Sequence, residues 1–295
     1  MKTSKKCSTI RLTFNLLVIF AIALIFASCT GKASKNLRIE YSENGIRLSS
    51  KIVSVYKQLD SIMGVQVYQK ELIEILNDAS PETYILKIGQ VKNENDMEHL
   101  YKLNTFLSLE KVFTAYNLEI DPNVSTQSSN LLEKVRAACI ALDSANISEE
   151  LKLKNDRIKF SLKNKFVVDE AIFQLTDLYA EFWHEESLKW IVFLQSNHED
   201  VKKGIESIPV ASFNMELVKE FVHEPYTNSS VLANLYKLNL IKENQQFTKE
   251  IQNKILLVSD AFNLIIQVQG EMLKRNKNEM RIQELNSSIE LLVND

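Results

Sequence analysis

Residues 251–272 read IQNKILLVSDAFNLIIQVQGEM, and their apolar side chains recur at alternating steps of four and three residues. The series has one polar member, Gln269, and consists of Ile251, Ile255, Val258, Phe262, Ile265, Gln269 and Met272. A repeat of this period places one side of a helix against other helices along its whole length. The stretch therefore predicts an all-α fold made of long helices.

The rest of the chain supports a bundle of long antiparallel helices. Only six glycines and four prolines occur among 295 residues, whereas all-β folds use such turn residues at short intervals. The C-terminal segment 274–295 fits either one long helix that projects past the body or two helices joined near Asn276. Apolar residues at helical spacing predict helices over about 46–76, 81–118, 130–143, 169–197 and 212–223, and again from 229 onwards.

Residues 150–165 leave two structures open, a helix and a short β-hairpin. Apolar and polar residues alternate in this segment, which is a strand pattern. We nevertheless expect a helix, because an isolated two-stranded hairpin is only marginally stable in water. The alternating apolar residues are Leu151, Leu153, Ile158, Phe160 and Leu162.

The N-terminus has the parts of an export signal. A basic leader containing Lys2, Lys5, Lys6 and Arg11 precedes an unbroken apolar run of twelve residues, 16–27. A membrane-spanning helix needs roughly 20 apolar residues, so a permanent span is disfavoured. The run ends in Phe26-Ala27-Ser28-Cys29, which resembles the lipobox of bacterial lipoprotein precursors.

This resemblance implies that residues 1–28 are a signal peptide and that Cys29 carries lipid, such as palmitate. The mature protein is then expected to be anchored in a membrane outside the cytoplasm. Thr30 follows the cysteine where an aspartate would retain a lipoprotein in the inner membrane, which favours the outer membrane or the cell surface. Polar residues after the cysteine predict a tether over 29–44, followed by a helical domain over 45–295.

Charge and cysteine content limit the partners of the mature chain. Loss of residues 1–28 removes four basic and no acidic residues, which changes the formal net charge from −3 to about −7. Nucleic acids favour clustered Lys and Arg, so no nucleic-acid partner is expected. Cys7 leaves with the signal and Cys29 takes the lipid, so Cys139 has no partner for an internal disulfide. It lies in an apolar run, which predicts a buried, inert thiol.

Two Glu-x-x-His pairs, Glu181 with His184 and Glu220 with His223, have the spacing found in di-iron helical bundles. At about 100° per residue, however, both pairs lie off the apolar faces of their helices, whereas buried metal ligands point inward. The run starting at His184 has Leu188 where the zinc-protease motif needs a second histidine. The sequence therefore gives no reason to assign a metal, a cofactor or a catalytic residue.

Two charged features are candidates for binding. Glu186 lies at the centre of an apolar helix face, between Trp183 and Trp190. A carboxylate there needs an ion partner or hydrogen bonds, so we expect an interhelical ion pair, with a ligand pocket as the alternative. The other feature is a basic stretch, which is either solvated charge or a contact for an acidic partner: Lys152, Lys154, Arg157, Lys159, Lys163 and Lys165.

Taken together, the sequence predicts a lipid-anchored envelope or cell-surface helical protein with a binding or structural role. It would contact the membrane through its N-terminal lipid and protein partners through helix faces. The basic stretch and the segment 274–295 would be its working parts. The alternative is a bundle that holds a small apolar ligand or a metal around Trp183, Glu186 and Trp190, either as a binding protein or as an enzyme.

Overall fold

The computed structural model shows an all-α bundle, with no strand among the residues that it describes. The predicted signal peptide and Cys29 lie outside those residues. None of the described helices combines the length and the apolar character that crossing a bilayer requires. The described residues are 35–59, 81–120, 128–164, 167–210, 215–222, 228–274 and 278–294.

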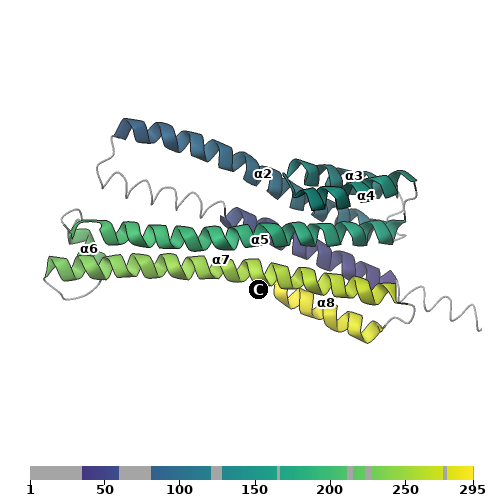
Figure 1. Cartoon of the computed structure of the whole chain (residues 1–295). Coiled ribbons are helices and arrows are strands. Elements are labelled where there is room, and N and C mark those ends of the chain that lie inside the picture. Colours follow the sequence, from purple (N-terminus) through teal and green to yellow (C-terminus); the bar gives the residue numbers. More distant parts are fainter. Residues whose placement is uncertain are drawn as a thin grey trace, which may run out of the picture.

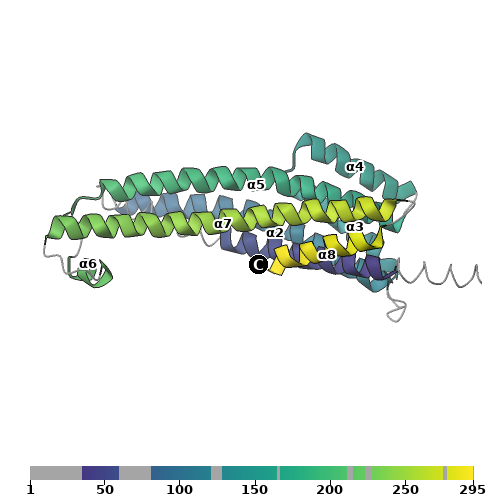
Figure 2. The same cartoon turned by 90° about the horizontal axis from the view of Figure 1, so that it is seen from below.

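Two long antiparallel helices, α5 (Val168–Ser207) and α7 (Ser229–Leu273), run the length of the molecule (Figure 1). At one end α6 (Met215–Val222) packs on α7. Toward the other end the bundle is thicker, as Figure 2 shows from below. The remaining elements are an N-terminal helix (residues 35–59), α2 (Pro81–Ile120), α3 (Ser128–Ser144), α4 (Glu149–Asn164) and α8 (Glu279–Asn294).

The core lies in the thick part of the bundle and is rich in aromatic side chains. Phe106 of α2 stacks on Phe182 of α5 with ring centroids 5.4 Å apart, and Tyr56 meets Trp183 edge to face at 6.1 Å. Such pairs add specificity to the burial of large apolar surfaces. The largest fully buried side chains are Trp183, Tyr41, Tyr56, Tyr116, Tyr179, Phe106, Phe113 and Phe182.

The apolar series that predicted the fold forms the buried side of α7. All seven of its members are buried, including Gln269 at 3% exposure. The amide of Gln269 donates to Tyr41 Oη at 2.7 Å, and this hydroxyl lies 3.1 Å from Thr176 Oγ1. The one polar member of the series is therefore satisfied by a hydrogen-bonded chain across three helices, as a buried amide requires. The prediction of a helical bundle is confirmed.

The segment for which a hairpin was the alternative is helical in its described part, because α4 spans Glu149–Asn164. Leu151, Ile158 and Leu162 are buried on one face. Leu153 and Phe160 point to the opposite side and are 62% and 70% exposed. The apparent alternation arose because these two apolar residues lie on the outer face of a helix.

The C-terminal segment folds back instead of projecting past the body. Chain direction reverses between Leu273 and Glu279, and α8 packs against α7. The apolar side of α8 closes the core, so the interpretation as one projecting helix is wrong. The buried apolar residues of α8 are Ile282, Leu285, Ile289 and Val293.

The predicted tether over 29–44 is too long at its C-terminal end. Residues 35–44 are helical and belong to the bundle. Tyr41 is fully buried, and Asn44 donates its amide to Asn286 Oδ1 at 3.1 Å. Ser42 is also buried and donates to the Ile39 carbonyl at 2.8 Å. Two of the polar residues that suggested a solvated tether, Ser42 and Asn44, are instead paired inside the fold.

Beyond the thick part, α5 and α7 continue side by side, and the N-terminal part of α2 runs along them (Figures 1 and 2). We define the two-helix arm as residues 190–207 of α5 with 229–250 of α7. Its interface is narrow and partly polar: His198 Nδ1 lies 2.7 Å from Asn244 Oδ1. Lys237 Nζ donates to the carbonyls of Glu206 and Ile208 and so satisfies the end of α5. Its buried residues in these two helices are Leu194, Asn197, Val201, Ile205, Leu232, Ala233 and Thr248.

Candidate functional site

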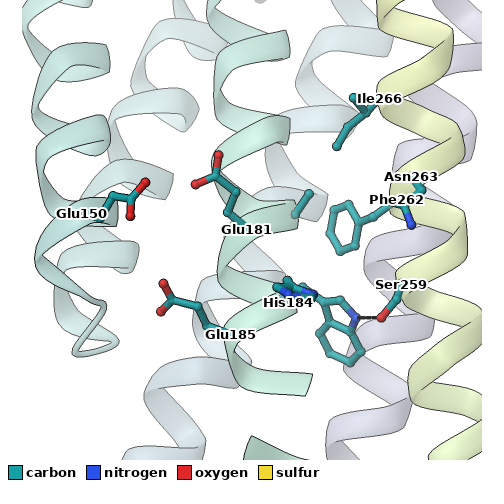
Figure 3. A pocket seen from close by; sticks show the side chains of 10 residues that line it. Glu150, Glu181, His184, Glu185, Ser259, Phe262, Asn263 and Ile266 are labelled. Atoms are coloured by element: carbon teal, nitrogen blue, oxygen red, sulfur yellow. Dashed lines mark hydrogen bonds between the residues drawn. The ribbon is translucent and has the colours of Figure 1, made fainter. Parts of the chain in front are cut away.

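A cleft of about 350 Å³ opens where α4, α5 and α7 meet (Figure 3). This volume is in the range of small-molecule sites. Most of its polar lining lies toward α4, and its apolar lining lies toward α7. The lining residues are Glu150, Ala180, Glu181, Trp183, His184, Glu185, Ser259, Phe262, Asn263 and Ile266.

The apolar half of the cleft is held rigidly. Trp183 Nε1 donates to Ser259 Oγ at 3.0 Å, and Ser259 in turn donates to the Ile255 carbonyl at 3.1 Å. Trp183 and Phe262 are nearly fully buried, at 1% and 2% exposure, so only their edges reach the cleft. An indole fixed by a hydrogen bond presents a preformed aromatic wall and loses little entropy when a ligand binds.

The opposite half is acidic. Glu150 comes from α4, whereas Glu181 and Glu185 lie one turn apart on α5. Lys154 Nζ lies 3.0 Å from Glu150 Oε1 and also pairs with Glu181. Ser148 donates its hydroxyl to Glu185 at 2.8 Å. The three carboxylates outnumber the single ammonium group of Lys154, so the cleft has a net negative charge.

Asp177 precedes Glu181 by one helical turn. Partial burial, and secondarily repulsion from Glu181, raises the pKa of this carboxyl to about 6. Between pH ~4 and ~6 the folded protein binds more protons here than the unfolded chain does, so this group's contribution to the free energy of unfolding falls as pH rises.

We therefore expect Asp177→Asn to raise the melting temperature at pH 7.5 and to leave it unchanged at pH 4. The stabilisation should be about 1 kcal/mol or less, because solvent screens a partly exposed group. Thermal denaturation followed by circular dichroism at the two pH values checks this. An equal shift at both values would show that the charge of Asp177 is not the cause.

Glu186, the candidate carboxylate of the sequence analysis, forms the expected interhelical ion pair. Its side chain is 3% exposed, and Oε2 lies 2.7 Å from Lys102 Nζ of α2. Oε1 lies 2.7 Å from Lys189 Nζ. Trp183 lines the cleft, but Glu186 and Trp190 do not. Trp190 packs instead against Tyr56 with ring centroids 6.2 Å apart.

The basic stretch on α4 is partly neutralised by the chain itself. Lys152 pairs with Glu149, Lys154 with two glutamates, and Lys159 with both Asp143 and Asp156. Arg157 and Lys163 are exposed, and Lys165 lies outside the described residues. Surface pairs of this kind leave less charge for an acidic partner than the sequence suggests.

The structure describes the side chains of only one of the two Glu-x-x-His pairs. Glu181 and His184 are exposed, as the helical geometry predicts. The side chain of Glu220 and the whole of His223 lie outside what is described. Within the described part of the chain, no three His, Cys, Asp or Glu residues are grouped so that they could hold a metal ion.

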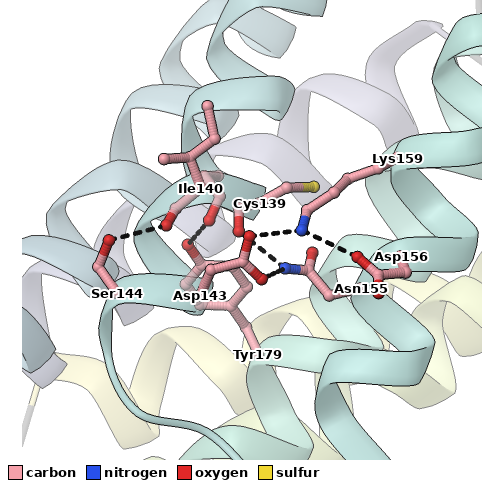
Figure 4. A network of polar contacts seen from close by, with 9 residues as sticks. Cys139, Ile140, Asp143, Ser144, Asn155, Asp156, Lys159 and Tyr179 are labelled. Atoms are coloured by element: carbon pink, nitrogen blue, oxygen red, sulfur yellow. Dashed lines mark hydrogen bonds and ion pairs between the residues drawn. The ribbon is translucent and has the colours of Figure 1, made fainter.

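Cys139 is buried on α3 beside a polar network that joins α3, α4 and α5 (Figure 4). Asn155 of α4 is fully buried and donates its amide to the Cys139 carbonyl and to Asp143 Oδ1, both at 2.7 Å. The hydroxyl of Tyr179 on α5 lies 3.1 Å from the Ala138 carbonyl. Burial raises the pKa of the Cys139 thiol to about 12, so it is the inert thiol that the sequence predicts.

The cleft was found only in part from the sequence. Trp183 was singled out, but Glu150 of α4 and Phe262 and Ile266 of α7, which are distant along the chain, could not be placed beside it. Comparison with known proteins adds nothing to this geometry: no family model, curated protein or solved structure matches the chain.

Proposed function

We propose that this protein is a lipid-anchored envelope lipoprotein whose helical domain binds a cationic group in the cleft between α4, α5 and α7. One observation carries the proposal: a cleft of about 350 Å³ is lined by three carboxylates on the side of α4, and by the fixed indole of Trp183 with Phe262 and Ile266 on the side of α7. Ammonium and guanidinium groups are stabilised by carboxylates, and the apolar stems that carry such groups can pack on apolar surface.

The size and polarity of the cleft define the ligand class. An apolar body can lie against Trp183, Phe262 and Ile266 while its charged end reaches the glutamates. Lys154 shows that Glu150 and Glu181 accept an ammonium in this geometry. The side chain of an arginine or lysine from a partner protein, or a polyamine, has this combination of an apolar stem and a cationic end.

The cleft can be tested by calorimetric titration with N-acetylargininamide and with its neutral isostere N-acetylcitrullinamide. We expect the arginine compound to bind at least about tenfold more tightly, because charge-assisted hydrogen bonds contribute roughly 1.5–3 kcal/mol. Glu181→Gln and Glu185→Gln should each weaken binding about tenfold, and Lys154→Met should strengthen it by removing a competing cation.

Glu199→Gln is the matched control, because Glu199 is an exposed glutamate on the same helix, away from the cleft. It should leave the affinity unchanged. Equal affinity for the arginine and citrulline compounds, or equal weakening by Glu199→Gln, would contradict a cation site in this cleft.

The anchor is tested by fractionation of producing cells. Cys29→Ala should move the protein from the membrane fraction to the soluble fraction, because no described helix is able to span a bilayer and the cysteine is the proposed acceptor of the lipid. Protease treatment of intact cells then separates a surface from a periplasmic location. A Cys29→Ala protein that remains as membrane-bound as the wild type would contradict the lipid anchor.

A further inference from the structure

The first described residue of the chain lies at the end of the bundle where α5 begins, α7 ends and α8 begins (Figures 1 and 2). Contacts between the helices fix this arrangement. Arg38 pairs with Asp169 near the start of α5, and Gln269 near the end of α7 donates to Tyr41. Asn286 donates to Glu40 at 3.1 Å. We call this the tether end and define it as residues 35, 167, 273–274 and 279–281.

The tether end exposes apolar side chains at helix termini. Leu273, the last residue of α7, is 69% exposed, and Met280 at the start of α8 is 72% exposed. Val167, just before α5, is 39% exposed. Isolated exposed apolar residues are common on protein surfaces, and Leu238 and Leu291 are comparably exposed elsewhere. Position, and not exposure alone, distinguishes Leu273 and Met280.

The distance of the tether end from the membrane follows from the length of chain between Cys29 and the bundle. Residue 35 is six residues after Cys29, and six residues span at most about 20 Å when fully extended. A lipid on Cys29 therefore holds this end of the bundle close to the bilayer surface. Apolar side chains that face the bilayer at this distance gain free energy by entering its interfacial region.

We propose that the tether end rests on the lipid bilayer, with Leu273 and Met280 inserted into the interfacial layer. The proposal depends on the lipid anchor of the proposed function. Lys274 and Arg281 adjoin the two apolar residues and are exposed. Their apolar stems can lie along the membrane surface while their charged ends stay among the headgroups.

The proposed contact between the tether end and the bilayer also determines the height of the cleft above the membrane. Glu181 follows Val167 by fourteen residues along α5, which is about 20 Å of helix at 1.5 Å per residue. With the bundle standing upright on the tether end, the cleft would lie above the headgroups, where a partner in the aqueous phase can reach it.

The test uses single cysteines introduced into the mature lipidated protein as Leu273→Cys and Met280→Cys. Leu238→Cys and Leu291→Cys are the controls, because these leucines are 61% and 69% exposed but lie away from the tether end. Cys139 is buried with a raised pKa, so a thiol-reactive fluorophore labels only the introduced cysteine. The proteins are reconstituted on phosphatidylethanolamine–phosphatidylglycerol vesicles, and circular dichroism verifies that each is folded.

Nitroxide-headgroup lipids should quench the labels at 273 and 280 at least about twofold more than the control labels, and aqueous iodide should show the reverse order. Equal quenching at all four positions on vesicle-bound protein would contradict the membrane contact of the tether end and leave the lipid anchor intact. Protection from iodide without lipid quenching would mean that protein covers the tether end. This result would also contradict the membrane contact. Failure of the lipidated protein to bind vesicles would contradict the lipid anchor, and with it the membrane contact of the tether end.

Discussion

Lys102→Met is expected to lower the free energy of unfolding by about 3 kcal/mol, because it leaves a buried carboxylate without its interhelical partner. Glu186 is 2% exposed, and Lys102 is 8% exposed. The partner that remains, Lys189, is 63% exposed in its side chain and cannot fully replace a buried ammonium. Glu186→Leu should cost a similar amount, because it leaves the ammonium of Lys102 largely buried without its carboxylate.

The double variant Lys102→Met/Glu186→Leu should recover most of this loss. Two apolar side chains in place of a buried ion pair avoid the cost of desolvating both charges. Urea denaturation of the wild type, both single variants and the double variant measures the coupling directly. A double variant whose loss equals the sum of the two single losses would show that the residues contribute independently and not as a pair.

Gly45→Ala should destabilise the bundle by about 2 kcal/mol, because the added methyl group has no room. A Cβ at this position would lie 2.4 Å from Cδ1 of Phe113 and 2.5 Å from two other atoms of the ring. Phe113 is 1% exposed and packs edge to face on Tyr41 with centroids 5.7 Å apart. The ring therefore cannot move aside without disturbing the core. The estimate already includes the gain of about 1 kcal/mol that alanine brings to a helix.

Gly270→Ala is the matched control. A Cβ added at Gly270 meets no heavy atom within 4 Å, so only the helix propensity changes and the protein should gain about 0.5–1 kcal/mol. Urea denaturation midpoints of the two variants should thus shift in opposite directions. Shifts of the same sign would mean that the close approach of the N-terminal helix to Phe113 is not what Gly45 provides.

The helices were predictable because their apolar period is long and regular. The series from Ile251 to Met272 covers six turns, so a single polar residue such as Gln269 could not hide it. α4 was harder to predict, since sixteen residues with Leu153 and Phe160 on the outer face also match a strand pattern. The tether was misjudged because Ser42 and Asn44 are polar, and a single sequence does not show that their partners lie across the core.

The candidate site was less predictable than the fold for a related reason. A helical projection of α5 shows that Glu186 points inward and that Glu181 points outward. It does not show which helices lie on either side. Ser259 is 76 residues from Trp183, and only the packing of α7 on α5 brings the hydroxyl to the indole. The lone buried Asn155 on the apolar face of α4 was the one local signal of a polar network that the pattern analysis overlooked.

The two-helix arm has the properties of a spacer. α5 alone contains 40 residues, or about 60 Å of helix, so α6 lies far from the tether end. The buried positions of α5 in the arm, Leu194, Asn197, Val201 and Ile205, recur on one face, so removing seven residues there, matched by seven from α7, keeps this face toward α7. Such a change would shorten the reach by about 10 Å and leave the aromatic core untouched. With the proposed lipid anchor, the length of α5 and α7 would set how far α6 lies from the membrane.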